Sequence, residues 1–476
     1  MLDQSFSLEN FNKIFEIENR KGNFETKYYS EKFHTLSNEL KKQRKIIKTY
    51  KSKGDIGKDD EHLKELNEEK KKIEEKKKNE LEITLQEYTE TVNDKNFKFK
   101  FTKFLHEASD KDVYPVKKDA PSFFAMKQLQ YNIHRTFKVK QSNRYLISKQ
   151  VQALLKDNFP KIVLRTDIKG FYESVPQERL LNMINDNQLL SPKSKTLIKS
   201  LFYSYNELTD QLKLPVEKRK GIPRGAGISA YLAELYMREV DNNIKRLTNV
   251  TYYARYVDDI IILFIPSWKM CLDDYKIKVT EITDKSDLLM NHLKTFSYDL
   301  ERDKSLMKIE FLGYVFSMEN SEYIGTSIST NKKNRYLTRI EKTIDIFLEQ
   351  KKFAPSDASK LLIHRFNYLT KNTRLHKPKK GLVGIYYSNS LIEQDCDDLD
   401  YMDKELLRII DEKLPTGIFN SLNKKLKEYS FSDGFINKRF FNINSKRKNI
   451  PDLRPDKLKE IKKLDNNFER IISIWK

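Results

Sequence analysis

Two adjacent aspartates, Asp258 and Asp259, stand between two short apolar runs, and this pattern limits the possible folds more than any other in the chain. Residues 252–256 precede the pair and residues 260–264 follow it, and both runs are rich in β-branched and aromatic side chains. Such runs predict two strands joined by a tight turn, with both carboxylates at its tip. Two like charges this close repel each other, and a bound divalent cation is the usual remedy.

A third carboxylate ends another predicted strand. Residues 161–166 are mostly apolar, Asp167 follows them, and Gly170 then interrupts the pattern. If this strand lies beside the hairpin, Asp167 meets Asp258 across the sheet. Three carboxylates at one sheet edge can hold two Mg²⁺ ions roughly 3.5–4 Å apart, which stabilises the attacking and leaving oxygens of a phosphoryl displacement. Taken alone, Asp167 is better explained as an ordinary aspartate at a strand end.

Five segments resemble the core motifs of reverse transcriptases and stand in the order of that family: residues 165–172, 221–229, 256–259, 300–305 and 311–314. The resemblance covers roughly residues 130–330. It implies an α+β fold shaped like a right hand, with fingers, a palm built on an antiparallel sheet, and a helical thumb. It also implies an RNA-directed DNA polymerase that uses two Mg²⁺ ions and deoxynucleoside triphosphates (dNTPs).

The resemblance assigns catalysis and metal binding to a small set of residues. The catalytic residues would be Asp167, Asp258 and Asp259, and the same three would bind metal together with the main-chain oxygen of Ile168. Tyr172 would lie under the sugar of the incoming nucleotide and exclude a 2′-hydroxyl by steric contact. The alternative for Tyr172 is an ordinary core tyrosine.

Further residues would contact the nucleotide and the primer. The predicted nucleotide contacts besides Tyr172 are Arg135, Arg144, Arg224, Gly225 and Lys304, and the predicted primer grip is Phe311, Leu312, Gly313 and Tyr314. Arg135 and Arg144 are alternatively surface or template-backbone contacts, and Lys304 is alternatively a surface lysine. Arg224 stands where the family commonly has Gln, and residues 226–227 depart from its common Ser-Pro, so the mode of template reading stays open.

The overall charge favours a polyanionic partner. The formal net charge is +21 and the isoelectric point is about 9.4, which predicts an RNA template and a DNA product as partners. A basic surface that only aids solubility is the alternative. Cys271 and Cys396 cannot form a disulfide framework or a zinc knuckle. Without a secretory signal or an apolar run of about 18 residues, we expect no membrane association and a bacterial cytoplasmic location.

The pattern along the chain divides it into four regions. Residues 1–95 predict a helical N-terminal extension, with a charged antiparallel hairpin over 31–95 that turns near residues 51–59. Residues 96–160 would form the fingers, 161–330 the palm, and 331–476 a helical thumb and C-terminal region. Within the palm we expect residues 268–300 to be largely helical and Ser229 to cap a helix over 230–247. The sequence leaves open whether the chain forms a homo-oligomer or binds a partner protein through this hairpin.

The style of the motifs is closer to bacterial defence-associated reverse transcriptases, of the retron and abortive-infection kinds, than to retroviral enzymes. This implies antiphage defence and the copying of a dedicated non-coding RNA. Two alternatives stay open. The first is a related polymerase: a template-independent or protein-primed DNA polymerase, or an RNA-directed RNA polymerase. The second is a catalytically dead scaffold that binds RNA. The sequence shows no second group of acidic residues after the predicted palm, so we expect no ribonuclease H domain. It also shows no Cys/His cluster, so we expect no endonuclease of the mobile-intron kind.

Overall fold

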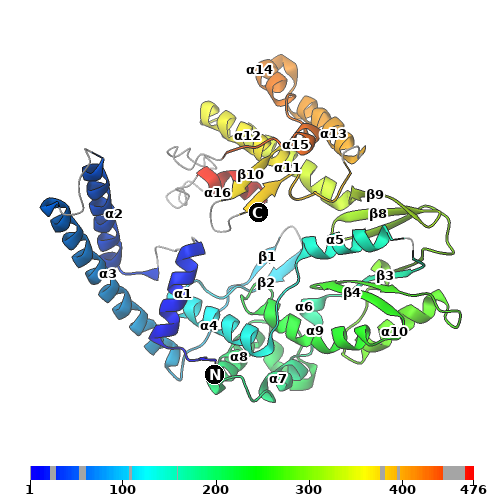
Figure 1. Ribbon diagram of the computed structural model, residues 1–476, viewed down its shortest axis with the longest axis horizontal. Coiled ribbons are helices and arrows are strands. Elements are labelled where there is room, and N and C mark those ends of the chain that lie inside the picture. Colours follow the sequence, from blue (N-terminus) through cyan, green and yellow to red (C-terminus); the bar gives the residue numbers. More distant parts are fainter. Residues whose placement is uncertain are drawn as a thin grey trace.

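The protein is a mixed α+β molecule with antiparallel sheets and many helices, as the computed structural model in Figure 1 shows. The structure describes residues 2–21, 28–52, 60–106, 110–157, 159–375, 381–393, 397–442 and 467–475. The predicted α+β class is therefore confirmed. Cys396 and most of the predicted turn of the charged hairpin lie outside the described residues. Across the described ranges, no helix combines the length and apolar character that crossing a bilayer requires.

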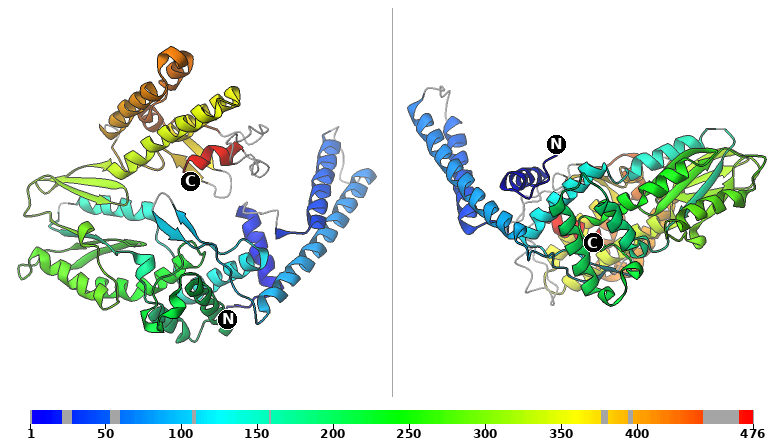
Figure 2. Two further views of the ribbon diagram at one scale, coloured as in Figure 1. Left: turned by 180° about the vertical axis from the view of Figure 1, so that it is seen from behind. Right: turned by 90° about the horizontal axis from the view of Figure 1, so that it is seen from below.

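The N-terminal region is helical, as predicted, and two of its helices form a projecting arm. Helix α1 spans Leu8–Lys21, α2 spans Glu31–Lys51 and α3 spans Glu61–Asn93. Helices α2 and α3 pack side by side and extend away from the rest of the molecule (Figures 1 and 2). The Ser30 and Asp60 side chains cap them by accepting from backbone N–H groups. Four buried leucines on the two helices form a thin apolar seam: Leu36, Leu40, Leu63 and Leu66.

Along the chain, a small hairpin and two helices come between the arm and the central sheet. Strand β1 (Phe104–His106) pairs with β2 (Lys111–Val113), and α4 (Ala120–Phe137) and α5 (Arg144–Leu155) follow. The Asp119 and Asn143 side chains cap α4 and α5. The hairpin is tied to a distant loop, because the Tyr114 N–H donates to the Arg224 carbonyl at 2.6 Å.

The central sheet contains the predicted hairpin and the predicted third strand. Its order is β4 (Val250–Tyr256), β5 (Asp259–Phe264), β3 (Ile162–Asp167) and β6 (Phe296–Asp299), and all neighbours are antiparallel. Strand β6 corrects the prediction of a largely helical segment over 268–300. That segment holds α10 (Leu272–Asp284) and a short 3₁₀ turn (His292–Lys294), and β6 then pairs with the free edge of β3. Long-range pairing outweighs the local helical pattern there.

The helices around the sheet come from the middle of the chain. They are α6 (Phe171–Ser174), α7 (Gln177–Asn185), α8 (Pro192–Leu208) and α9 (Ser229–Lys245), with short 3₁₀ turns at Gln211–Lys213 and Val216–Lys218. Ser229 does not cap α9 as predicted. The N-cap position belongs to Ile228, and the Ser229 hydroxyl donates to the Pro223 carbonyl at 2.6 Å instead. The serine therefore fixes the preceding loop rather than the end of the helix.

A second sheet and the C-terminal helices complete the fold. Strands β7 (Met307–Phe311), β8 (Tyr314–Glu319) and β9 (Glu322–Ile328) form an antiparallel meander. The remaining elements are α11 (Thr330–Gln350), α12 (Pro355–Thr370), β10 (Asn372–Leu375), β11 (Gly381–Gly384), α13 (Asp397–Lys413), α14 (Thr416–Leu426), α15 (Phe431–Ile436), α16 (Asn467–Ile472) and a 3₁₀ turn at Ser473–Trp475. Most of the described residues after Ile328 are helical, and β10 and β11 form a two-stranded sheet among them.

The two faces of the central sheet belong to two different hydrophobic cores. Because side chains alternate along a strand, Ile162 and Leu164 of β3 face one core and Val163 faces the other. The first core includes α1, α3, α4, α8 and α9, and the second includes α5, the β7–β9 meander and α11–α15. The acidic end of the sheet is therefore held from both sides.

Candidate active site

The turn between β4 and β5 carries Asp258 and is fixed by three backbone features. Val257 has φ +61°, a left-handed conformation that is strained for a β-branched residue. The Arg255 guanidinium donates to the Val257 carbonyl at 2.9 Å. The Ile168 N–H donates to the Asp258 carbonyl at 3.3 Å, which ties the turn to the segment after β3. Strain of this kind persists only where surrounding contacts hold the turn in place.

Arg255 is the buried anchor of this turn, and sequence reasoning missed it. Its guanidinium pairs with Glu234 at 2.8 Å and with Asp241 at 2.8 Å, both on α9. The Tyr253 hydroxyl also donates to Asp241, at 2.6 Å. The hairpin is thereby fixed to α9, whose N-terminus follows the loop at residues 221–227. The sequence did contain a signal for this role: Arg255 lies within a mostly apolar strand, and a buried cation there requires acidic partners.

The three predicted catalytic aspartates lie at one end of the central sheet. Asp167 is opposite Asp259 in the strand register, rather than opposite Asp258 as predicted, and Asp258 occupies the adjoining turn. Burial raises the pKa of the Asp258 carboxyl, and the charge of Asp167 adds to the rise. Burial also raises the pKa of Asp259, with Asp258 adding to it. Asp167 thus lies close enough to Asp258 and Asp259 to disfavour their ionised forms.

Three cations face these acids, and none was predicted from the sequence. Lys294 Nζ donates to Asp167 Oδ2 at 2.8 Å, and Arg165 Nη2 lies 3.5 Å from Asp259 Oδ1. Lys294 and Lys111 also counteract the raised pKa of Asp258. Lys111 belongs to β2 and approaches from the small hairpin, where it lies 3.7 Å from Glu173. Their roles depend on strand pairing between distant segments, so no local motif marked them.

The carboxylates at this sheet edge are the type of ligand that a divalent cation prefers, but they do not form a preassembled metal site. Asp167 Oδ1 is buried and has no hydrogen-bond partner, which is the state expected of an oxygen available to a metal. Within the described ranges, however, no group of three or more His, Cys, Asp or Glu side chains converges closely enough to hold a metal ion. This corrects the expectation of three converged carboxylates. Asp167 and Asp259 are instead paired with Lys294 and Arg165.

Tyr172 and Arg224 lie together beside the aspartates. The Arg224 guanidinium lies 4.9 Å from the centroid of the Tyr172 ring and pairs with Glu173 at 2.8 Å. Burial raises the pKa of the Tyr172 hydroxyl, Arg224 opposes the rise, and Asp258 adds to it, so the hydroxyl is within electrostatic reach of that carboxylate. The ring is only partly buried against the first core. Its position therefore suits a ligand contact as well as packing.

The glycine loop before α9 touches two other elements closely. Gly225 has φ +91°, and a Cβ there would lie 2.5 Å from Val113 Cγ1 on β2. A Cβ on Gly227 would clash with the Gln130 side-chain amide on α4. Only glycine allows both approaches of the backbone. The loop therefore packs directly against β2 and α4, and these contacts fix where α9 begins.

The predicted primer grip is a tight turn between β7 and β8. Leu312 and Gly313 both have positive φ, +48° and +76°, as in a type I′ hairpin turn. Phe311 and Tyr314 flank it and are buried. Arg144 approaches this turn: its guanidinium lies 5.9 Å from the Tyr256 ring centroid, and its Nη2 lies 3.2 Å from the position of a Cβ on Gly313. Arg144 therefore joins the turn to the acidic hairpin.

One predicted nucleotide contact, Lys304, is not brought to the aspartates, and another, Arg135, is exposed on a helix. Residues 299–300 pair with the start of β3, whereas Asp167 is at its end, so Lys304 lies toward the opposite end of the strand. Its Nζ donates to Ser321 at 2.6 Å. Arg135 is exposed on α4, with its guanidinium 5.5 Å from the Tyr131 ring centroid. Among the described residues, Lys294 and Lys111 are the lysines that act on the acids.

Comparison with known proteins gives one family. Residues 101–316 match the family model described as reverse transcriptase (RNA-dependent DNA polymerase). None of the curated proteins matches the sequence. Among solved structures, a similar chain is apo telomerase from Candida Tropicalis, truncated from its C-terminal domain, with 15% identity over 48% of this chain and a TM-score of 0.32. The alignment spans only 55% of the telomerase chain, and a TM-score this low supports no further conclusion.

Proposed function

We propose that this chain, whose residues 101–316 match the reverse transcriptase family model, copies RNA into DNA from dNTPs with the help of two Mg²⁺ ions. The observation that carries the proposal is the gathering of Asp167, Asp258 and Asp259 at one end of the central sheet. Asp258 and Asp259 have pKa values raised by burial and by neighbouring carboxylates, so this edge of the sheet is poised for a cationic ligand. The family generally uses divalent metal ions, and carboxylate oxygens suit Mg²⁺.

Asp167, Asp258 and Asp259 would hold the ions together with the main-chain oxygen of Ile168. Bound ions of this kind lower the pKa of the attacking hydroxyl and neutralise the leaving pyrophosphate. The remaining tasks belong to this chain's own side chains. Lys111 on β2 would contact the triphosphate, because its charge acts on Asp258 and its Nζ lies 3.7 Å from Glu173. Arg135 and Lys304 have no comparable position.

Tyr172 would select deoxynucleotides. Its ring is held by Arg224 on one side and by Phe171, whose ring centroid lies 5.6 Å away, on another. A ring fixed this way leaves little room for an added 2′-oxygen on a sugar lying against it. Gly225 would let the loop backbone approach the templating base pair, and the turn at residues 311–314 would position the primer terminus.

We assign residues 96–160 to fingers, 161–330 to palm and 331–476 to a thumb of a right-hand polymerase, with residues 1–95 as an extension. The sheet that carries the acids supports the palm, and the mainly helical region after Ile328 supports the thumb. The β7–β9 meander shares a core with α11–α15, so the palm and thumb are packed together at their boundary.

We further propose a role in bacterial antiphage defence, in the cytoplasm, with a dedicated non-coding RNA as template. The style of the motifs and the net charge of +21 support it. A second candidate is a template-independent or protein-primed DNA polymerase. It is favoured by Arg224, which lies over Tyr172 where the family commonly has Gln.

The test is nucleotide incorporation by the purified full chain given an RNA template, a DNA primer, dNTPs and Mg²⁺. The double variant Asp258→Ala, Asp259→Ala should lose incorporation by on the order of 10³-fold or more, because both acids act as a unit with Asp167. The matched control is Glu68→Ala, Glu69→Ala, an adjacent exposed acidic pair on the arm. Parent-like activity of the aspartate variant would refute the site.

The same assay separates the alternatives. Incorporation that requires the RNA and prefers dNTPs over ribonucleotides supports reverse transcription. Incorporation without RNA supports the template-independent alternative. A parent protein that binds RNA yet incorporates nothing with any metal ion would be an RNA-binding scaffold.

A further inference from the structure

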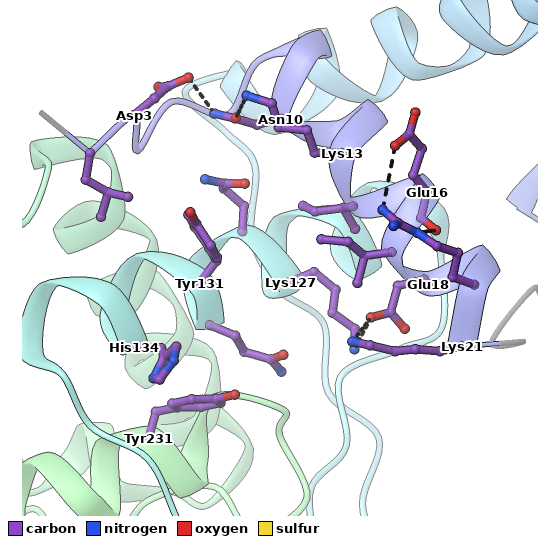
Figure 3. Close-up of a pocket in the computed structure, with 16 residues that line it drawn as sticks. Asp3, Asn10, Lys13, Glu16, Glu18, Lys21, Lys127, Tyr131, His134 and Tyr231 are labelled. Carbon is purple, nitrogen blue, oxygen red and sulfur yellow. Dashed lines mark hydrogen bonds and ion pairs between the residues drawn. The ribbon is translucent and has the colours of Figure 1, made fainter. Parts of the chain in front are cut away.

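A cavity of about 610 Å³ lies between α1, α4 and the start of α9, away from the aspartates. Figure 3 shows Tyr131, His134 and Tyr231 along one side of it, with Lys13, Glu16 and Lys21 of α1 on the other. Its α4 residues recur at helical spacing, so one face of that helix forms a continuous wall. A cavity of this size is in the range of small-molecule and nucleotide sites.

The charge of the lining argues against an anionic ligand inside the cavity. Four cations and three acids line it. Lys21 and Lys127 already pair with Glu18, at 3.0 and 3.3 Å, and Lys13 pairs with Glu9 at 2.7 Å. A phosphate placed there would compete with these ion pairs. The lining instead suits a ligand that is neutral and polar.

The aromatic wall suits a planar ligand. The His134 and Tyr231 ring centroids are 6.0 Å apart, and Tyr131 is 41% exposed with Arg135 lying over it. His134 Nδ1 lies 2.6 Å from the Val139 carbonyl, which can only accept, so Nδ1 carries the proton. In the neutral imidazole, Nε2 is then an acceptor on the other side of the ring. Neutral bases stack on such surfaces whatever their sequence.

Gln130 supplies the specific polar group and links the cavity to the active-site loop. Gln130 is one of the residues that line the cavity, and no described residue forms a hydrogen bond with its amide. The same amide lies so close to Gly227 that a Cβ there would clash with it. An amide offers one donor face and one acceptor face, which matches the edge of a nucleobase. A ligand held by Gln130 would therefore sit directly behind the glycine loop.

We propose that this cavity binds an unpaired base of the RNA strand, stacked against Tyr131, His134 and Tyr231 and hydrogen-bonded by Gln130. The sugar–phosphate backbone would remain outside, along Arg135, Lys138 and Lys140, which are exposed at and beyond the C-terminal end of α4. The identity of the ligand as RNA rests on the proposed function. The site itself adds a binding role for the N-terminal helix α1, which lies outside the segment that matches the family.

The test is equilibrium binding of a fluorescent single-stranded RNA oligonucleotide to the full chain, without dNTPs. Tyr131→Leu and Gln130→Ala should each weaken binding about 5- to 100-fold, the range expected for loss of one stacked or hydrogen-bonded base. Tyr401→Leu is the matched control, since Tyr401 is 46% exposed on α13, far along the chain from the cavity. Binding by both cavity variants equal to that of the parent would overturn the inference.

A second measurement locates the base. RNA carrying a single 5-iodouridine should cross-link under ultraviolet light to a peptide containing Tyr131, His134 or Tyr231, and unlabelled RNA should compete. Cross-links confined to other peptides would overturn the inference even if the variants bind weakly through misfolding. Because neither readout needs catalysis, a protein that never incorporates nucleotides would refute the proposed function while leaving this site intact.

Discussion

Lys332 shows how neighbours determine the chemistry of a single residue. Its Nζ lies 4.4 Å from the Tyr314 ring centroid and donates to the Ser388 carbonyl at 2.9 Å. Burial lowers the pKa of its ammonium group to about 7, and the charges of Arg144 and Arg335 add to the shift. Near neutral pH this lysine, beside the predicted primer grip, changes charge.

The lowered pKa predicts a pH-dependent stability. In the unfolded chain the lysine keeps a pKa of about 10.4, so between about pH 7 and 10 the unfolded state binds more protons than the folded state. The free energy of unfolding contributed by Lys332 should therefore rise with pH across that window. We expect the parent to gain stability relative to Lys332→Met as pH rises from 7 to 10. Thermal melts should show this, and parallel curves for parent and variant would contradict it.

The control for that series is Lys342→Met, an exposed lysine on the same helix. Its difference from the parent should stay constant with pH. Comparing differences between variants also removes the contribution of the tyrosines that titrate at the upper end of the range.

Among the elements, the loop before α9 has the tightest packing requirement. Gly225 combines a positive φ with a close approach to Val113, and Gly227 approaches Gln130. The Arg224 carbonyl also accepts from Tyr114 N–H. Two elements from distant parts of the chain, β2 with the residue after it and α4, therefore contact this loop, so the loop can move only if they move with it.

Gly225→Ala should lower both stability and nucleotide incorporation. The left-handed backbone alone costs an alanine about 1–2 kcal/mol, and the clash with Val113 adds to it. Adding Val113→Ala should restore the stability lost to the clash and leave the loss caused by the left-handed backbone of the alanine. Thermal melts and incorporation rates of the two single variants and the double variant would separate the two contributions.

Gly417→Ala serves as the control because a Cβ there meets nothing within 4 Å. It should leave stability within about 0.5 kcal/mol of the parent. Full additivity of Val113→Ala and Gly225→Ala would show that the two residues do not interact and would contradict the packing argument.

At the scale of the whole molecule, two cores meet at the central sheet while the arm remains apart. Phe33, Leu81 and Leu85 at the base of the arm join the first core, whereas the leucines of its distal seam belong to neither core. Figure 2 shows the distal arm projecting from the body in both views. The polymerase core should therefore fold without it.

Replacing residues 40–70 with a short Gly/Ser linker should test this independence. We expect the melting temperature to change by only a few degrees and incorporation on a short primer–template to stay within about twofold. Calorimetry and the incorporation assay would measure both. Loss of the folded state would show that the distal arm supports the core. Loss of activity alone would show that the arm takes part in holding nucleic acid.

The sequence by itself determined the features that depend on neighbouring residues. Short apolar runs rich in β-branched and aromatic residues around Asp258 and Asp259 predicted the hairpin, and the apolar run before Asp167 predicted its partner strand. Helical spacing predicted the two arm helices. These signals are local because side-chain periodicity and turn chemistry act over a few residues.

Only the tertiary structure decided what meets across long distances. Residues 296–299 became a strand because β3 had an unpaired edge, and that pairing placed Lys294 rather than Lys304 beside Asp167. Arg255 became a buried anchor because α9 supplied Glu234 and Asp241. The repelling carboxylates did not converge into a ready-made metal cage among the described residues. Long-range strand pairing and the electrostatics of burial set these outcomes, and neither is encoded in any short stretch of the chain.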